Sequence, residues 1–443
     1  MLDKNYYPMY LYARDFTDAA VKAGEKPFEI ALRRGEGEVA RYSTVLYAEG
    51  HDDENFAYAE RIIKFLLWAY GGYKFYIYGA DKKLLNRLSE CYSDMGERSF
   101  DYKFMKGVYL RGLEFEAVTS PDKLPAESVT AAPAAPEGAG KRIGFDAGGS
   151  DRKVTACING VPVYENETIW HPKLNSDPQY HIDGIHESVD AALEALGGEV
   201  DAIGVSTAGI VVDNEVRVAS LFRKVPEEVY AEKIFPIYKN LAAEYGCPVK
   251  VANDGDVAAL AGAFGLKRGG VLGIAMGTSL AGGYVDRDMR IRGYLNELAF
   301  VPVDANREAA ADEWSGDRGV GGMYHSQDAV IRLAPEAGIE LDPSLTPAEK
   351  LKVVQNLAEE GDERAAAIFT RLGEYAAYTL MWFNEFYDFD KAIFLGRVTS
   401  GKGGDTLIST ARELLKKEGS AVTIELPDEM SRRLGQSFTA TQL

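Results

Sequence analysis

Apolar and polar positions along residues 1–118 predict a small α+β domain. Residues 28–48 are predicted to form two strands joined through Gly35 and Gly37. Residues 52–72 combine an acidic start, apolar residues at helical spacing and a Gly-Gly end, which together predict a helix. Three further elements are predicted: a strand at 73–79, a helix at 81–93 and a strand at 104–118. This part of the chain contains no glycine-rich phosphate loop and no recognisable catalytic cluster.

Residues 119–141 differ in composition from the sequence on either side. The segment is rich in Ala and Pro, contains no aromatic residue and shows no amphipathic period, which is typical of a linker. A chain of 443 residues is too long for one core. A linker at this point leaves two parts of ordinary domain size, residues 1–118 and residues 142–443.

The first chemical motif after the linker is DAGGSDRK at residues 146–153, which lies between two short apolar strands. Two consecutive glycines let the backbone approach a phosphate, and the amides of Gly148, Gly149 and Ser150 can then donate hydrogen bonds to its oxygens. Asp146 would offer a carboxylate to a magnesium ion that bridges ATP phosphates, directly or through water. A plain hairpin whose glycines only shape the turn explains this motif equally well.

A second glycine-rich loop, GTSLAGG at residues 277–283, follows an apolar strand predicted at residues 271–276. Its small and hydroxyl residues suit a phosphate held from the other side; they are Gly277, Thr278, Gly282 and Gly283. The two loops lie about 130 residues apart, which suggests one nucleotide held between two lobes. Neither loop is a Walker A motif, and a dinucleotide-binding fingerprint is also absent.

A third segment, residues 392–408, passes from an apolar strand into small residues before a helix predicted from residue 409. Gly396, Ser400 and Gly401 would let an adenine ring lie close to the backbone. An ordinary turn from strand to helix is the alternative interpretation of this segment.

The candidate catalytic base lies in a strand-to-helix turn between the two phosphate loops. Residues 249–252 are predicted to form a strand, and an alanine-rich helix is predicted to begin at Asp256 and end at Gly265. Asn253 and Asp254 therefore lie at the turn, where side chains often face a cleft. Either aspartate can cap the helix, but Asp256 suits that position better and leaves Asp254 free to accept the proton of an attacking hydroxyl.

The order of these motifs resembles the ROK (repressor, open reading frame, kinase) family of sugar kinases and related repressors. VSTAGIVVD at 205–213, NELAF at 296–300 and the last twelve residues also match motifs of that family. The resemblance implies an α/β fold of two ribonuclease-H-like lobes, of the actin and hexokinase type, around a nucleotide cleft. The implied segments are the separate amino-terminal α+β domain at 1–118, the linker at 119–141, a first lobe at 142–251 with a carboxy-terminal helix at 431–443 packing back on it, and a second lobe at 252–430.

The resemblance also implies roles for individual residues. Asp254 would be the general base, and Asp146 would hold magnesium. The sugar would contact Asn253, Asp254, Glu297 and Gly209. The phosphates would be held by both glycine loops and Lys153, and the adenosine by the segment from Gly396 to Gly401. ATP and magnesium are therefore the implied cofactors and a sugar or polyol the implied small-molecule partner, and a homodimer is implied because family members are often dimers.

Several residues depart from the family pattern around its structural zinc and its sugar. Phe300 stands at the position of the zinc-binding histidine, so a histidine that also touches the sugar is lost. Glu313, Ser315 and Val320 stand where three zinc-binding cysteines are usual, so we predict no zinc. Gly322 replaces a sugar-binding glutamate. The sugar site is thus rebuilt, and glucose is not assumed to be the acceptor.

Negative charge is in excess in the whole chain, and Asp151 adds a negative charge near the phosphate-binding part of the first loop. The net charge of −19 repels phosphate backbones and anionic membranes, so neither nucleic acid nor a membrane is an expected partner. Asp151 stands where the family usually has a lysine, and Lys153 or Arg152 is expected to compensate for it.

The cysteines and the chain start favour a reducing cytoplasm. The chain has three cysteines, far apart in sequence, which predicts neither a disulfide framework nor a zinc ribbon. We find no signal peptide pattern and no run of eighteen apolar residues.

The leading hypothesis is an ATP- and magnesium-dependent carbohydrate kinase that phosphorylates a hydroxyl of a sugar or polyol. Its rival is a non-catalytic sensor of the same fold that binds a sugar or nucleotide and signals through residues 1–118. A third possibility is an interaction protein whose aromatic-rich amino-terminal part docks a partner. Turnover distinguishes the kinase from the sensor, and magnesium-dependent ATP binding distinguishes it from the interaction protein.

Overall fold

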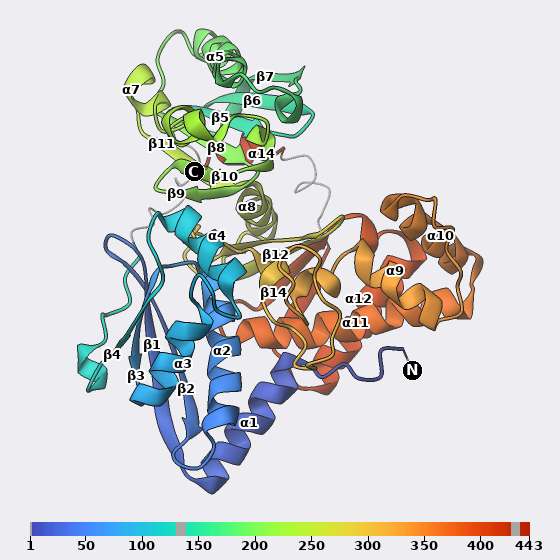
Figure 1. Cartoon of the computed structure of the whole chain (residues 1–443). Helices are drawn as coiled ribbons and strands as arrows, with labels where there is room; N and C mark the ends of the chain where they lie inside the picture. The colour runs from blue at the N-terminus through green and yellow to red at the C-terminus, as the bar shows by residue number, and fades with distance from the viewer. Residues whose placement is uncertain (1, 130–138, 427–434) are drawn as a thin grey trace. The chain divides into compact units, whose positions relative to one another are not determined.

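The computed structural model describes residues 2–129, 139–426 and 435–443, and the chain packs into two compact units (Figure 1). The first unit comprises residues 1–130, 274–282 and 296–426. The second unit comprises residues 131–273, 283–295 and 427–443. Both units mix helices and strands, so the predicted α/β class is confirmed. The predicted domain boundaries stay a prediction, but residues 1–118 pack in one unit with residues 296–426.

The amino-terminal part of the first unit is built on a four-stranded sheet with the order β2-β1-β3-β4. β3 and β4 are parallel, whereas β1 is antiparallel to both β2 and β3. The predicted elements at 28–48, 52–72, 73–79 and 81–93 are confirmed as two strands, a helix, a strand and a helix. Their bounds are β1 Glu25–Gly35, β2 Glu38–Tyr47, α2 Asp52–Ala69, β3 Lys74–Tyr78 and α3 Lys82–Cys91, and β4 spans Glu114–Ala117. In Figure 1 the helices α2 and α3 lie across one face of this sheet.

The strand predicted at 104–118 is wrong over its first half. Residues Ser99–Tyr109 form the helix α4, and only Glu114–Ala117 is a strand. The buried residues of α4 are Asp101, Met105 and Val108, whose spacing of three to four places them on one helix face. This helical spacing outweighs the aromatic and β-branched residues that favoured a strand.

The helix α1, Met9–Ala23, is not among the predicted elements, although its buried residues recur at helical spacing: Met9, Ala13, Phe16 and Ala20. The residues before it join the amino terminus to a distant part of the first unit. The Met9 amide donates to the Val303 carbonyl at 3.0 Å, and the Tyr7 amide donates to the Asp304 carboxylate at 3.0 Å. The amino-terminal part is therefore integrated into the first unit from its first residues onward.

Part of the predicted linker packs against the sheet. Leu124 is buried and contacts Ala31 and Val39. Ser128 forms a bridge with Val39 through hydrogen bonds of 3.0 Å in both directions. Residues 130–138 of the segment lie outside the described residues.

The second unit contains a five-stranded sheet with the order β11-β8-β5-β6-β7. The strands β5, β8 and β11 are parallel, β6 is antiparallel to β5, and β7 is antiparallel to β6. Apolar residues from the sheet and from α5, Pro178–Ala195, form the core. The strands are β5 Lys141–Ala147, β6 Asp151–Ile158, β7 Val161–Ile169, β8 Ala202–Thr207 and β11 Val249–Asn253, with the separate hairpin β9 Ile210–Val212 and β10 Glu215–Val218.

Two helices complete the sequence motifs of the second unit. α8, Asp254–Leu266, follows β11 directly. α14, Gln436–Ala440, lies on β5 and β8, where a Cβ at Gly144 would come within 1.9 Å of the Ser437 carbonyl oxygen and one at Gly204 within 1.7 Å of that of Ala440. Residues 431–434 of the helix predicted at 431–443 lie outside the described part of the chain. α7 spans Leu241–Tyr245.

The remainder of the first unit is largely helical. Its sheet has the order β13-β12-β14-β15, and the long helix α11 packs against α9, α10 and α12. The elements are β12 Val271–Met276 and β13 Leu280–Val285, which begin or end in the second unit, then α9 Gln327–Glu336, α10 Pro347–Glu360, α11 Glu363–Asn384, β14 Lys391–Leu395, α12 Gly401–Lys417 and β15 Thr423–Glu425. No helix within the described residues is long and apolar enough to cross a membrane.

Candidate functional site

Three parallel strands of the second unit end at one edge of its sheet. In this register Asp146 of β5 pairs with Ser206 of β8, and Asn253 of β11 pairs with Thr207 of β8. The carboxyl ends of neighbouring parallel strands are adjacent, and ligands of α/β sheets commonly bind there. The residues predicted to hold magnesium and to act as the base therefore lie at the same sheet edge.

Asp146 is a buried carboxylate in an unfavourable electrostatic environment. Its residue is only 6% exposed. Burial raises the pKa of Asp146 to about 6, and the nearby Asp254 and Asp151 carboxylates also raise it. A hydrogen bond from Ser206 and the charge of Lys153 lower the pKa, but by less. A bound cation would stabilise the ionised form of such a group, and oxygen ligands are those that magnesium prefers. The residues present thus fit the predicted magnesium site.

Asp254 is the first residue of α8. Burial raises its pKa, while a hydrogen bond from the Gly255 amide at 3.0 Å lowers it. No lysine or arginine among the described residues lies within ion-pair distance of this carboxylate. Asp254 is half-buried, and a carboxylate that has lost part of its hydration without gaining a cationic partner accepts a proton more readily than a fully exposed one.

Asn253, rather than Asp256, caps this helix. The Asn253 Oδ1 accepts a hydrogen bond from the Gly255 amide at 2.8 Å, and its Nδ2 donates to the Gly209 carbonyl at 2.8 Å. Asp256 is buried and accepts a hydrogen bond from the Tyr284 amide at 3.1 Å. The predicted cap is therefore wrong, because the helix begins two residues earlier than its sequence pattern predicted. The prediction that Asp254 does not cap holds, and contact between Asn253 and a sugar stays a prediction.

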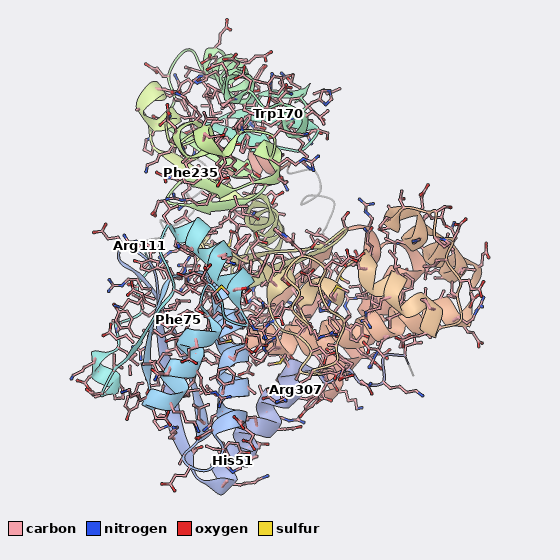
Figure 2. All side chains as sticks on the ribbon, viewed as in Figure 1. His51, Phe75, Arg111, Trp170, Phe235 and Arg307 are labelled. Carbon is pink, nitrogen blue, oxygen red and sulfur yellow. The ribbon has the colours of Figure 1, made fainter. Side chains whose placement is uncertain are left out.

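The first glycine loop is held by Trp170, which Figure 2 labels in the second unit. The Trp170 indole donates to the Gly148 carbonyl at 2.8 Å, and the Trp170 amide donates to the Ser150 carbonyl at 3.1 Å. The carbonyls of Gly148 and Ser150 are thereby engaged. No acceptor among the described residues takes the amides of Gly149 and Ser150, so these donors are available to an anion.

The two cations expected beside this loop are both paired with carboxylates. Lys153 pairs with Asp151 at 3.3 Å, so it compensates for that carboxylate as expected. Arg152 pairs instead with Glu187 and lies over the Trp170 ring.

A lysine that no sequence motif marks lies over the loop. A Cβ added at Gly149 would be 3.1 Å from the Lys173 ammonium nitrogen. The 3-10 turn Pro172–Leu174, which begins two residues after Trp170, places Lys173 there. Its ammonium has no carboxylate within 4 Å in the described part of the chain.

The second glycine loop divides into two pairs of residues. Gly277 and the exposed Thr278 form the turn between β12 and β13, and the Gly277 amide donates to the Ser279 carbonyl at 3.0 Å. Gly282 and Gly283 are buried within β13. A Cβ at Gly282 would come within 2.3 Å of Leu298, and one at Gly283 within 2.1 Å of the Gly255 carbonyl oxygen. Close packing thus requires the second pair to be glycine, whatever their role towards phosphates.

The third segment begins its helix earlier than predicted. α12 starts at Gly401 rather than at residue 409. Gly396 has a φ of 95°, and a Cβ there would lie 2.3 Å from the Met276 carbonyl oxygen, so β14 ends close to the backbone of β12. Gly396, Ser400 and Gly401 are exposed, and their role towards adenosine stays a prediction. The Glu359 carboxylate accepts a hydrogen bond from the amide of Lys402, the residue after Gly401, at 2.8 Å.

The remaining predicted sugar ligands, Glu297 and Gly209, lie in different units. Gly209 has a φ of 114°, and a Cβ there would lie 2.3 Å from the Val218 carbonyl oxygen at the hairpin of β9 and β10. Glu297 is half-buried in the first unit, where its amide donates to the Trp68 carbonyl at 3.1 Å.

Comparison with known proteins decides the family of this chain. The model of the ROK family matches residues 142–426. The chain belongs to the ROK family. No curated protein matches it. The ROK fold is shared with a ROK hexokinase from Thermus thermophilus, which is 19% identical with a TM-score of 0.53 over 68% of this chain and 97% of that one. It is also shared with a ROK transcriptional regulator, a homologue of the E. coli MLC protein, which is 15% identical with a TM-score of 0.52 over 68% of this chain and 77% of that one.

In this ROK chain, Phe300 and residues 313–320, which stand where the family binds zinc, are held by aromatic packing and ion pairs. Phe300 stacks obliquely on Trp68, with ring centroids 4.3 Å apart. Asp317, which lies between Ser315 and Val320, is bound by cationic side chains of residues 61–98. The described residues contain no cluster of three histidine, cysteine, aspartate or glutamate side chains that could hold a metal ion by themselves. The residues at the four zinc-ligand positions do not fit that metal.

Proposed function

We propose that this ROK protein is a kinase that transfers the γ-phosphoryl group of ATP to a hydroxyl of a sugar or related polyol. The observation that supports this proposal is a pair of carboxylates at one edge of the five-stranded sheet, namely the buried Asp146 of β5 and the half-buried Asp254 directly after β11. Burial raises the pKa of both, which is unfavourable for a residue that serves stability alone. Such groups are characteristic of active sites, and the family contains sugar kinases.

In the proposed reaction Asp254 is the general base. The acceptor hydroxyl oxygen bonds to the γ-phosphorus while its proton moves to an Asp254 carboxylate oxygen. The bond from the γ-phosphorus to the bridging oxygen breaks, and ADP leaves with that electron pair. Most of the rate enhancement would come from positioning and electrostatic stabilisation, because the protein takes little part in the covalent chemistry of phosphoryl transfer.

The phosphates would be held by the amides of Gly149 and Ser150 and by the ammonium group of Lys173. Asp146 would hold magnesium, which when bound would neutralise charge on the phosphate oxygens. Lys153 would contribute less, because Asp151 already neutralises it. Gly277 and Thr278 would contact the phosphates from the second glycine loop, and Gly396, Ser400 and Gly401 would line the adenosine site. We propose a reducing cytoplasm as the setting and a homodimer as the assembly.

A second candidate function is a non-catalytic sensor that binds a sugar or nucleotide. It is favoured by the changes at Phe300 and Gly322, which remove two family contacts to the sugar, and by the fold shared with a ROK regulator. Asp254 distinguishes the two candidates, because a sensor does not require a base.

The deciding experiment is a coupled assay of ADP release against a panel of hexoses, amino sugars and polyols. Asp254→Asn should lower kcat by roughly 10²–10⁴-fold while Mg-ATP binding, measured by calorimetry, is retained. Asp183→Asn, an exposed aspartate in the same unit, serves as the matched control and should leave kcat unchanged. Binding of a sugar or of ATP by the wild type without any turnover would reject the kinase and favour the sensor.

A further inference from the structure

The amino-terminal part of the chain is joined to residues 313–320 by a buried cluster of charges within the first unit. Lys64, which is fully buried, pairs with Asp317 at 2.9 Å and with Asp101 at 2.9 Å. Arg98 pairs with Asp317 at 2.5 Å, and Arg61 pairs with it at 3.3 Å. Buried charges are costly unless they are paired, so this cluster fixes the position of α2 and α4 against Asp317.

Aromatic packing joins the same helices to Phe300. The Trp68 ring of α2 lies 4.3 Å from the Phe300 ring, and the Phe100 ring of α4 lies 6.1 Å from it. The Trp68 indole also donates to Asp101 at 2.7 Å, so the aromatic contact and the charge cluster share one residue. Movement at Lys64 or Asp101 would therefore be transmitted to Phe300.

The end of α2 holds the segment that contains Glu297. The Trp68 carbonyl accepts the Glu297 amide at 3.1 Å, and the Ala69 carbonyl accepts the Asn296 amide at 2.9 Å. The last carbonyls of a helix have no partner within the helix, so they are available for such contacts. Asn296 has a φ of 50°, a left-handed conformation that is rare outside glycine, and the Tyr387 hydroxyl hydrogen-bonds its side chain at 2.9 Å. This conformation depends on partners outside the segment.

We propose that the amino-terminal part of the chain positions the acceptor-binding residue Glu297. α2 holds the backbone of Asn296 and Glu297 from its carboxyl end, and the charge cluster at Asp317 fixes α2 in place. This assignment rests on the proposed function in one respect, namely that Glu297 binds the acceptor. It gives residues 1–118 a role within substrate binding instead of that of an independent sensor or docking domain.

Lys64→Met is the test variant. The methionine preserves the length of the side chain, Asp317 keeps Arg61 and Arg98, and Asp101 keeps the Trp68 indole, so we expect the variant to fold. Phe300→Leu is the second variant, since it removes the aromatic contact and leaves every charge in place. Lys83→Met is the matched control, because it removes an exposed ion pair with Asp52 in the same part of the chain.

Amide hydrogen exchange on the full-length protein provides the first measurement and does not depend on turnover. Exchange in a peptide covering residues 294–301 should accelerate about tenfold in Lys64→Met and in Phe300→Leu. The strands β5 and β11 should exchange as in the wild type, and Lys83→Met should change neither region. Unchanged exchange at 294–301 in both folded variants would overturn the proposal, as would an equal acceleration throughout the chain.

Steady-state kinetics provide the second measurement. In both variants the KM for the acceptor should rise about tenfold, while kcat and the KM for ATP stay within about twofold of the wild type. A general loss of structure would lower kcat and raise the KM for ATP as well. A fall in kcat together with an equal rise in the KM for the acceptor and in the KM for ATP would therefore overturn the positioning role. Absence of turnover in the wild type would reject the proposed kinase but leave the exchange measurement to decide the positioning of residues 296–300.

Discussion

Asp146→Asn should stabilise the protein and inactivate it in the same step. Asp146 is buried near the end of β5, where the charge of Asp254 acts on it. Asparagine has the same shape and can still accept a hydrogen bond from Ser206, but it carries no charge to desolvate. A side chain that lowers the stability of the folded protein is expected to serve its function instead.

The size of the effect follows from the pKa. The pKa of Asp146 rises from its ordinary value of 3.8 to about 6, and each pKa unit corresponds to about 1.4 kcal/mol. Keeping the side chain ionised therefore costs the folded state about 3 kcal/mol at pH 7. Between pH 3.8 and about 6 the folded state binds the proton and the unfolded state does not, so wild-type stability falls as pH rises. The advantage of asparagine is full above pH 6 and vanishes below about pH 4.

The assay should report on the second unit alone, because the two units need not unfold together. Trp170 is the only tryptophan of that unit, so 5-fluorotryptophan labelling gives it a separate fluorine signal. Urea unfolding of this signal at several values between pH 4 and pH 8 gives the free energy of unfolding of wild type and variant. Magnesium with ATP should narrow the gap at pH 7, because only the wild type gains a cation at Asp146.

Two results would refute this reasoning. If Asp146→Asn is less stable than the wild type at pH 7, the ionised carboxylate stabilises the fold and is not kept there at a cost for binding a cation. A stability gap that does not change between pH 4 and pH 8 would show that it arises from packing rather than from ionisation.

Further variants test the other assignments. Lys173→Met should weaken ATP binding about tenfold and AMP binding much less, because Lys173 is proposed to contact the phosphates that AMP lacks. Lys173→Arg should restore ATP binding, and calorimetry measures the affinity for each nucleotide. Asp317→Asn should lower the free energy of unfolding of the first unit by about 3–5 kcal/mol, because buried cations lose their partner. Asp53→Asn removes an exposed ion pair and should cost under about 1 kcal/mol. Urea unfolding measures both changes. Glu297→Gln should raise the acceptor KM and leave the KM for ATP unchanged in the coupled assay. A chelator should abolish turnover without lowering the unfolding temperature measured by calorimetry.

Local patterns in the sequence predicted most strands near the site. The apolar runs before residues 146, 253 and 277 end at β5, β11 and β12, because a buried parallel strand needs a short apolar segment and its end is marked by small or polar residues. The helix α2 was equally visible from its acidic start and its Gly-Gly end. The α/β class and the family followed from the order of these motifs.

Features that depend on distant residues were not visible. Lys173 reaches the first loop only because Trp170 anchors the chain there, and nothing local marks that contact. Gly282 and Gly283 resemble a phosphate loop, although the side chain of Leu298 and the backbone of Gly255 require them to be small. The cap at Asn253 was missed because helix boundaries are uncertain by one or two residues in any local pattern.

The integration of residues 1–118 is the largest feature that the sequence concealed, and its physical cause is the charge cluster. Lys64 reads as an ordinary polar position on a helix, yet it is fully buried between Asp101 and Asp317, which is 253 positions away in the chain. An Ala- and Pro-rich segment suggests independent domains, but buried ion pairs on its two sides require a fixed arrangement. Asp146 and Asp254 belong to the second unit, whereas Glu297 belongs to the first unit together with residues 1–118. Variants at Asp254 should act mainly on kcat, and variants that loosen the amino-terminal part should raise the KM for the acceptor, because Asp254 is proposed to take the proton whereas α2 holds the segment that contains Glu297.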